Sequence, residues 1–126
     1  MSDKMLAYTK RDGKKMLEEF DGVAFEHKGV ALHLRRISST VWMISLLNSG
    51  YKTRGIGRTI REAVERYDAE DGAILENWKY EAGHKHLYDF ANAYLESNKM
   101  IVIEKTYDYK SGRLVIGSKI KAGDLI

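Results

Sequence analysis

A glycine-bearing stretch, residues 51–59 (YKTRGIGRT), lies between an apolar run and the strongest helical pattern in the chain. The apolar run Val41–Leu47 predicts a strand. The sequence from Thr59 to about Ala69 predicts a helix, because its apolar residues recur at the spacing of a buried stripe. The members of that stripe are Ile60, Ala63, Val64 and Tyr67. A strand, a short connection and a helix must therefore follow one another here, which limits how the rest of the chain can be arranged.

The start of this helix carries features that suit an anion. Thr59 followed by Glu62 forms a capping box, so the expected helix has a defined N-terminus with free backbone N–H groups and a favourable dipole. Gly55 and Gly57 would let a ligand approach the backbone closely. Three cations surround them: Lys52, Arg54 and Arg58. Two interpretations stay open, namely a pyrophosphate cradle and a tight connection with a solvated basic face.

The composition predicts one globular domain spanning residues 1–126, with 44% hydrophobic and 31% charged residues. The net charge of +3 is compatible with a phosphate-bearing ligand, but it is too small to establish nucleic-acid binding. The absence of cysteine excludes disulfides, thiolate catalysis and cysteine-ligated zinc. No apolar run reaches membrane-spanning length and the polar first residues do not predict a signal peptide, so we expect a cytoplasmic protein with no membrane contact.

The first half of the chain predicts one helix and three strands. Residues 10–20 predict a short amphipathic helix, because their apolar members share one helical face. Val23–His27 and Val30–Ile37 predict two strands joined at Lys28-Gly29, with Ala31, His33 and Arg35 on one face of the second strand. With the Val41–Leu47 strand they predict a three-stranded antiparallel meander.

The second half predicts a further strand, a helix and a hairpin. Residues 73–80 follow a glycine that ends the helix and favour a strand over a helix. Residues 83–98 predict a second amphipathic helix, and residues 100–109 and 113–120 predict a β-hairpin. The resulting fold class is α+β, a mixed but mostly antiparallel sheet flanked by helices with one βαβ-type crossover.

The run Leu47–Ala73 resembles motif A of the GNAT superfamily of N-acetyltransferases. In that family a strand is followed by an arginine or glutamine, a G-x-G turn and a long helix. Lys52 stands in the arginine or glutamine place, and Gly55-Ile56-Gly57 stands in the place of the G-x-G turn. The order of elements is similar too, so the resemblance implies the GNAT-like acyl-CoA N-acyltransferase architecture.

The resemblance implies acetyl-CoA (an acyl-CoA) as cofactor and acetyl transfer to an amine acceptor as the reaction. The residues that would bind the cofactor are Leu47, Lys52, Thr53, Arg54, Gly55, Ile56, Gly57 and Arg58. Tyr94 stands in the place of the acid that protonates the leaving thiolate, with Tyr88 as competitor. The base would be Glu76 or His84, with Glu81 also within reach of the acceptor.

Several residues depart from the family pattern. Lys52 lacks the planar fork of arginine, and Asn98-Lys99-Met100 lacks the glycine and phenylalanine of the family. Small virion-associated proteins of tailed phages carry a degenerate version of this fold. The alternative implied by the resemblance is therefore a non-enzymatic phage or mobile-element protein, which acts as a virion or binding component with a protein partner.

Two further groups of residues have simpler interpretations that compete with a functional one. His84, His86, Glu81 and Asp89 form a candidate metal cluster, for which solvated residues at a helix start are the favoured interpretation, so no metal is predicted. A nucleic-acid face is the second candidate, and scattered solubilising charge is favoured over it. Its members would be Lys10, Arg11, Lys14, Lys15, Arg35, Arg36, Arg54, Arg58, Arg61, Tyr8, Trp42 and Tyr51.

Overall fold

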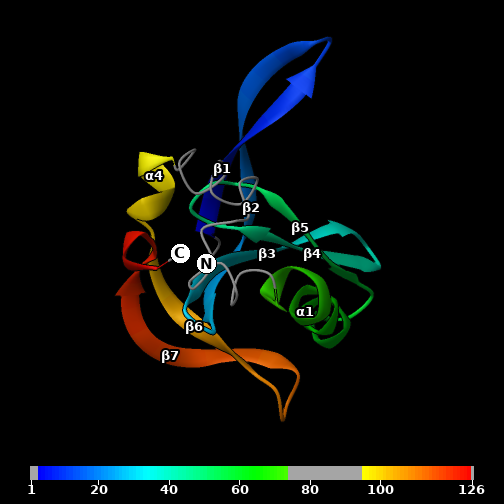
Figure 1. Cartoon of the computed structure of the whole chain (residues 1–126), viewed down its shortest axis with the longest axis vertical. Helices are drawn as coiled ribbons and strands as arrows, with labels where there is room; N and C mark the ends of the chain where they lie inside the picture. The colour runs from blue at the N-terminus through cyan, green and yellow to red at the C-terminus, as the bar shows by residue number, and fades with distance from the viewer. Residues whose placement is uncertain (1–2, 74–94, 126) are drawn as a thin grey trace.

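The computed structural model describes residues 3–73 and 95–125 and contains one seven-stranded, mostly antiparallel sheet with short helical elements (Figure 1). The strands are β1 (Asp3–Arg11), β2 (Lys14–His27), β3 (Val30–Ser38), β4 (Val41–Leu46), β5 (Lys52–Gly57), β6 (Val102–Asp108) and β7 (Arg113–Lys121). The helical elements are α1 (Ile60–Tyr67), the π-helical turn η1 (Asp68–Gly72), α4 (Glu96–Lys99) and the 3-10 turn η2 (Ala122–Asp124). The predicted α+β class with a mostly antiparallel mixed sheet is confirmed.

The strands are ordered β5-β4-β3-β2-β6-β7, and β1 pairs with β2 outside this path. β2 and β6 form the one parallel pair among the described strands, which makes the sheet mixed. The meander β2-β3-β4 is confirmed, including its turn at Lys28-Gly29, where φ is +54° and +79°. Two positive φ angles belong to the hairpin turn that matches the twist of the strands it joins.

The prediction of a helix over residues 10–20 is wrong. These residues form the end of β1, a turn at Asp12-Gly13 and the start of β2, in a hairpin that projects from the rest of the molecule (Figure 1). Asp12 and Gly13 have φ of +52° and +76°, so the Asp-Gly pair forms the same kind of two-residue turn. This turn signal prevails over the helical spacing of the few apolar residues that follow it.

Two apolar cores lie on opposite faces of the sheet. On one face α1 packs its buried residues Ala63, Val64 and Tyr67 against β3 and β4. The other face is covered by β1, whose Met5 and Ala7 belong to the second core together with Leu47 and Ala122. β1 therefore lies over the sheet face that α1 leaves uncovered.

Two buried asparagines fix this second layer. The Asn98 side chain accepts a hydrogen bond from the Leu6 N–H at 2.8 Å and donates one to the Leu6 carbonyl at 2.7 Å. It thus occupies the open edge of β1 as a neighbouring strand would. Asn48 Nδ2 donates to the carbonyls of Ala122 at 2.6 Å and Leu125 at 3.2 Å. These bonds hold β1 and the chain end in place over the sheet.

The C-terminal half follows the prediction in part. The hairpin is confirmed, as β6 and β7 pair antiparallel from Val102↔Lys121 to Asp108↔Arg113. The expected break at Asp71-Gly72 is wrong, because the chain stays helical as η1 through Gly72. The helix expected over 83–98 does not pass through Leu95, which is extended and precedes α4. The strand expected over residues 73–80 is helical at Ala73, and its remainder lies outside the described residues, as does the rest of the expected helix.

The βαβ-type crossover and the GNAT-specific arrangement stay predictions. The described fold consists mainly of strands. β5 pairs with β4 at one end of the strand order, and β6 and β7 lie at the other end.

Among the described residues, no helix is long and apolar enough to cross a membrane.

Candidate functional site

The predicted glycine turn is a strand. Residues Lys52–Gly57 form β5, in which exposed and buried residues alternate. Lys52, Arg54 and Ile56 are exposed, whereas Thr53, Gly55 and Gly57 face α1. The local geometry expected for a pyrophosphate cradle is therefore wrong.

The two glycines of β5 have a packing role. A Cβ atom on Gly55 would lie 2.9 Å from the Tyr67 Cβ, and one on Gly57 would lie 2.6 Å from the Ala63 nitrogen. Any larger residue would push α1 off the strand. The glycines let the helix lie directly on β5, and this explains their presence without a ligand.

Three backbone N–H groups on or near this strand have side-chain partners. The Arg54 N–H donates to Asp71 Oδ2 at 2.7 Å, and the Gly55 N–H donates to Thr53 Oγ1 at 3.0 Å. At the start of α1, the Glu62 N–H donates to Thr59 Oγ1 at 3.0 Å, which confirms the predicted N-cap. A carboxylate beside the strand also opposes the approach of a phosphate to it.

The remaining predicted site residues are dispersed or outside the described part. Leu47 is buried in the second core, and Arg58 is exposed just before α1. The predicted acid, bases and metal cluster lie outside the described residues: Tyr94, Tyr88, Glu76, His84, Glu81, His86 and Asp89. Within the described ranges no group of three or more His, Asp or Glu side chains could hold a metal ion.

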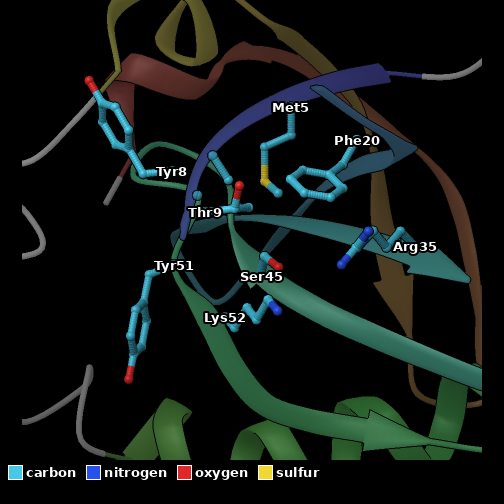
Figure 2. Close-up of a pocket in the computed structure, with 10 residues that line it drawn as sticks. Met5, Tyr8, Thr9, Phe20, Arg35, Ser45, Tyr51 and Lys52 are labelled. Carbon is cyan, nitrogen blue, oxygen red and sulfur yellow. The ribbon is translucent and has the colours of Figure 1, made fainter. Parts of the chain in front are cut away.

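A cavity of about 250 Å³ lies instead between β1 and the sheet (Figure 2). Ten described residues line it: Met5, Ala7, Tyr8, Thr9, Phe20, Arg35, Ser45, Gly50, Tyr51 and Lys52. We call it the Arg35 cavity. None of these ten residues is acidic.

Sheet register brings the polar residues of the Arg35 cavity together. Ser45 on β4 lies opposite Lys52 on β5, and Arg35 on β3 lies opposite Met43, two residues from Ser45. Because side chains alternate along each strand, Arg35, Ser45 and Lys52 share one face. Figure 2 shows these side chains along one side of the cavity, with Phe20 next to Arg35 and Met5 next to Phe20.

The close approach of β1 to the sheet depends on Gly50. Gly50 has φ of +74°, and a Cβ atom there would lie 2.7 Å from both the Ala7 Cβ and the Leu6 carbonyl oxygen. A side chain at this position would therefore displace β1 and open the cavity. This glycine is needed both for its backbone conformation and for space.

Arg35 is the unusual residue of the cavity. Its guanidinium carbon lies 4.2 Å from the centre of the Phe20 ring, an arrangement typical of a cation–π contact. Its Nε atom is buried and has no hydrogen-bond partner within the described part of the chain. Burial lowers the pKa of the Arg35 guanidinium below its ordinary value. The side chain still carries its charge, since arginine does not deprotonate in proteins.

The Arg35 cavity suits an anionic ligand that also has a planar or apolar part. Lys52 supplies a second cation, and no ion pair joins it to another described residue. Phe20 and Met5 supply an apolar wall, and Tyr8 and Tyr51 lie at one end of the cavity (Figure 2). Ser45 supplies a buried hydroxyl. The sequence placed Arg35, Lys52 and the two tyrosines among basic and aromatic candidates, but it offered no reason to include Phe20 or Ser45.

A second polar cluster was not predicted at all. His27 Nε2 lies 2.8 Å from Asp68 Oδ1, and the Tyr109 hydroxyl donates to Asp68 Oδ2 at 2.6 Å. The same hydroxyl lies 3.1 Å from His27 Nε2, and Lys28 Nζ lies 3.7 Å from Asp68 Oδ1. Desolvation and the hydrogen bond to Asp68 raise the pKa of Tyr109 above its ordinary value. Sequence separations of 41 and 82 residues leave no local signal for this cluster.

Comparisons with known proteins identify no relative of this chain: no protein-family model, no curated protein and no solved structure matches it. The geometry of the described residues is therefore the basis for a functional proposal.

Proposed function

We propose that this chain is a binding protein whose Arg35 cavity holds a nucleotide, with the phosphate at Arg35 and Lys52 and the base against the apolar and aromatic wall. The observation that carries this proposal is the buried Arg35 Nε, which has no partner among the described residues, in a cavity whose ten described lining residues include no acidic one. A phosphate oxygen supplies the acceptor that Arg35 Nε lacks among the described residues, and guanidinium groups recognise phosphate with two parallel hydrogen bonds.

The energetics favour a ligand over an empty cavity. A buried polar group without a partner costs about 1–3 kcal/mol, and the cation–π contact with Phe20 offsets about 0.5–2 kcal/mol. A charge-assisted hydrogen bond to phosphate would restore the acceptor and is about twice as strong as a neutral one. Stacking of a base on an aromatic ring adds about 1–3 kcal/mol. A nucleotide can make both contacts at once.

The test is a titration of ¹⁵N-labelled protein with adenosine monophosphate, adenosine or inorganic phosphate, followed by backbone amide chemical shifts. We expect adenosine monophosphate to bind more tightly than either of its parts and to shift the amides of Ser45, Tyr51 and Lys52. Amide shifts confined to residues outside the Arg35 cavity, or no binding at millimolar ligand, would contradict the proposal.

Acetyl transfer to an amine stays a second candidate, favoured by the capped N-terminus of α1 directly after a strand. Its acid would be Tyr94 and its base Glu76 or His84. Acetyl-CoA in the same titration distinguishes the two functions. Shifts at Gly57–Ile60 would support coenzyme binding at the helix start. Shifts at Ser45 and Lys52 alone would mean that the coenzyme binds only through its nucleotide in the Arg35 cavity.

A further inference from the structure

His33 is a buried titratable residue that belongs neither to the lining of the Arg35 cavity nor to the cluster around Asp68. It lies on β3, shielded from solvent, and shares a face of that strand with Arg35. Its Nε2 atom lies 2.9 Å from the backbone carbonyl oxygen of Asp3, at the start of β1. A carbonyl oxygen can only accept a hydrogen bond, so Nε2 carries the proton of the neutral ring. Nδ1 is then unprotonated, and it has no hydrogen-bond partner within the described ranges.

Asp3 ties the start of β1 to the strands beside it through two hydrogen bonds. Its carbonyl oxygen accepts from His33, and its carboxylate oxygen Oδ2 accepts from the Ala24 N–H at 2.9 Å. A Cβ atom on Gly22 would lie 2.5 Å from His33 Cε1, so the glycine lets the backbone of β2 lie against the ring. The ring of His33 therefore contacts β2 and is bonded to β1, and its protonation state bears directly on the attachment of β1.

The strand that Asp3 attaches is also the strand that covers the Arg35 cavity. Four residues of β1 line this cavity, which lies between β1 and the sheet (Figure 2). The first of them is Met5, two residues after Asp3. Release of the start of β1 would therefore free Met5 and widen the path by which a ligand enters or leaves.

Protonation of His33 would place a positive charge and an unpaired N–H group within this attachment. Burial lowers the pKa of His33 below its ordinary value, and the charge of Arg35 acts in the same direction. The hydrogen bond to Asp3 and the charges of Asp3 and Asp21 favour the protonated ring, but burial outweighs them. The residues opposite His33 on β2 and β4, an alanine and a serine, carry no charge. The attached position of β1 thus favours the neutral ring.

We propose that His33 is a pH-sensitive switch, whose protonation below neutral pH releases the start of β1 and speeds the exchange of the ligand in the Arg35 cavity. The effect on the ligand rests on the proposed nucleotide site, whereas the release of β1 does not. When β1 is released the ring meets water and titrates near pH 6.5. The attached state binds this proton less readily, so attachment is fully favoured above pH 6.5 and weakens as pH falls below it. One such proton can raise the released fraction by at most about tenfold between pH 7.5 and pH 5.5.

The first measurement uses the ligand-free protein and follows hydrogen exchange of the Ala24 amide by NMR between pH 7.5 and pH 5.5. This amide is bonded to Asp3 and reports on the attachment of β1. We expect its protection factor to fall by about three- to tenfold over this range. It should also exchange faster than the Leu34 amide in the centre of the sheet, since local release requires less free energy than global unfolding. Equal protection of the two amides would mean that β1 is released only when the whole protein unfolds, and would overturn the switch.

His33→Gln is the matched variant, because its side-chain amide can still donate to the Asp3 carbonyl but does not titrate. The protection factor of the Ala24 amide in this variant should change by less than about twofold over the same pH range. An equal fall in the variant and the wild type would assign the pH dependence to another group and contradict the role of His33.

The second measurement times the release of a fluorescent analogue of adenosine monophosphate by stopped flow at pH 7.5 and pH 5.5. We expect the dissociation rate to rise by about three- to tenfold at the lower pH in the wild type and by less than about twofold in His33→Gln. Titration of the phosphate itself is common to both proteins and cancels in the comparison. Slower release from the wild type at pH 5.5, relative to the variant, would mean that protonated His33 acts as an added cation of the site, and would overturn the switch.

The His33 ring itself provides a test that does not depend on the folding of a variant. In ¹⁵N-labelled wild-type protein the ring should carry its proton on Nε2 and should stay neutral at pH 6.5, where an exposed histidine is half protonated. A ring that is half protonated at that pH, or one with its proton on Nδ1, would contradict the switch.

The two measurements separate the failure of this inference from the failure of the proposed function. If the analogue binds in the Arg35 cavity but its release does not depend on His33, the proposed function stands and this inference fails. If the Ala24 amide responds as expected but no nucleotide binds, the proposed function fails, and the control of ligand exchange fails with it.

Discussion

The His27–Asp68–Tyr109 cluster and the Arg35 cavity are both polar groups set among aromatic rings, but they differ in how their polar atoms are satisfied. In the cluster, both oxygens of Asp68 accept hydrogen bonds from groups of two other segments. In the cavity, Arg35 stacks on Phe20 and its Nε has no partner in the described part of the chain. A set of groups whose polar atoms are paired with one another can serve the fold alone, whereas a half-buried cation whose buried Nε has no acceptor among the described residues favours a ligand.

The position of each group in the fold agrees with this difference. The cluster joins the end of β2, the first residue of η1 and the loop after β6, so it holds together three segments distant in sequence. The Arg35 cavity lies between β1 and the sheet, and Tyr8 and Tyr51 lie at one end of it (Figure 2). We therefore expect the cluster to contribute mainly to stability and the cavity mainly to binding.

The largest effect is expected for Asp68→Ala. This change removes the partner of His27, which is 3% exposed, and the acceptor of the Tyr109 hydroxyl. We expect the free energy of unfolding to fall by about 2–4 kcal/mol, the range for breaking a buried hydrogen-bonded pair, with nucleotide affinity unchanged. Urea denaturation measures the change, and Glu65→Ala on the exposed face of α1 is the control. A loss below 0.5 kcal/mol, roughly the effect of an ordinary surface change, would show that the cluster is not a structural tie.

Arg35→Gln should weaken nucleotide binding without lowering stability, the reverse of what we expect for Asp68→Ala. Nucleotide affinity is expected to fall by about 10- to 100-fold, or about 1.4–2.8 kcal/mol, with loss of a charge-assisted pair, while stability stays the same or rises because a desolvated charge is removed. The matched control is Arg36→Gln. Arg36 is adjacent in sequence, but its guanidinium stacks on Trp42 at 4.7 Å on the opposite face of β3. Equal losses of affinity in both variants would indicate a non-specific charge effect and contradict the proposed site.

Tyr109→Phe tests how much the hydrogen bond from the Tyr109 hydroxyl to Asp68 contributes to stability. Loss of the hydroxyl should reduce the free energy of unfolding by about 1 kcal/mol, the value of one hydrogen bond. The variant should also respond differently to alkaline pH. The folded-state pKa of Tyr109 is raised, so its contribution is fully present below the ordinary tyrosine pKa and is lost as pH rises through the folded-state value.

Thermal unfolding between pH 8 and pH 11 checks this sign. The wild type should lose more stability above pH 10 than Tyr109→Phe does, because only the wild type loses this proton. Tyr107, whose pKa burial also raises, is present in both proteins, so its contribution cancels in the comparison. A larger alkaline loss in the variant would contradict the assigned hydrogen bond.

The smallest effect is expected for Lys52→Gln. Lys52 is exposed at the side of the cavity and presents a mobile point charge, so we expect a loss of about two- to fivefold in affinity with no change in stability. The slope of log affinity against log salt concentration should fall by about 1. Lys119→Gln, an exposed cation on β7, serves as control. An affinity loss as large as that of Arg35→Gln would show that exposed charge, and not the half-buried Arg35 guanidinium, dominates binding.

Much of the fold could be predicted from local patterns. The meander, the N-cap at Thr59 and the C-terminal hairpin each follow from turn residues and periodicity within a few residues of one another. The N-terminal hairpin was missed because Met16, Leu17 and Phe20 have a spacing that also fits a helix, although Asp12-Gly13 signals a hairpin turn. The glycines of β5 were misassigned because their role depends on how closely Ala63 and Tyr67 of α1 pack against them, which the glycine spacing does not indicate.

Less of the candidate site than of the fold could be predicted from the sequence. Alternation along β3 correctly placed His33 and Arg35 on one face. The Phe20 ring reaches Arg35 because β1 and the first part of β2 lie over the sheet, and Asn98 and Gly50 fix that layer through contacts distant in sequence. A pattern confined to one strand could not indicate which face β1 would cover or which cation it would enclose.

The most direct test of the account observes the Arg35 Nε–H group itself. In protein labelled at arginine side chains, Arg35→Lys identifies its Nε–H resonance, which is then followed by NMR during addition of adenosine monophosphate. We expect a downfield shift and slower exchange with water for this resonance alone, because a phosphate oxygen becomes its acceptor. An Arg35 resonance that stays unchanged while the ligand saturates the protein would contradict the central claim.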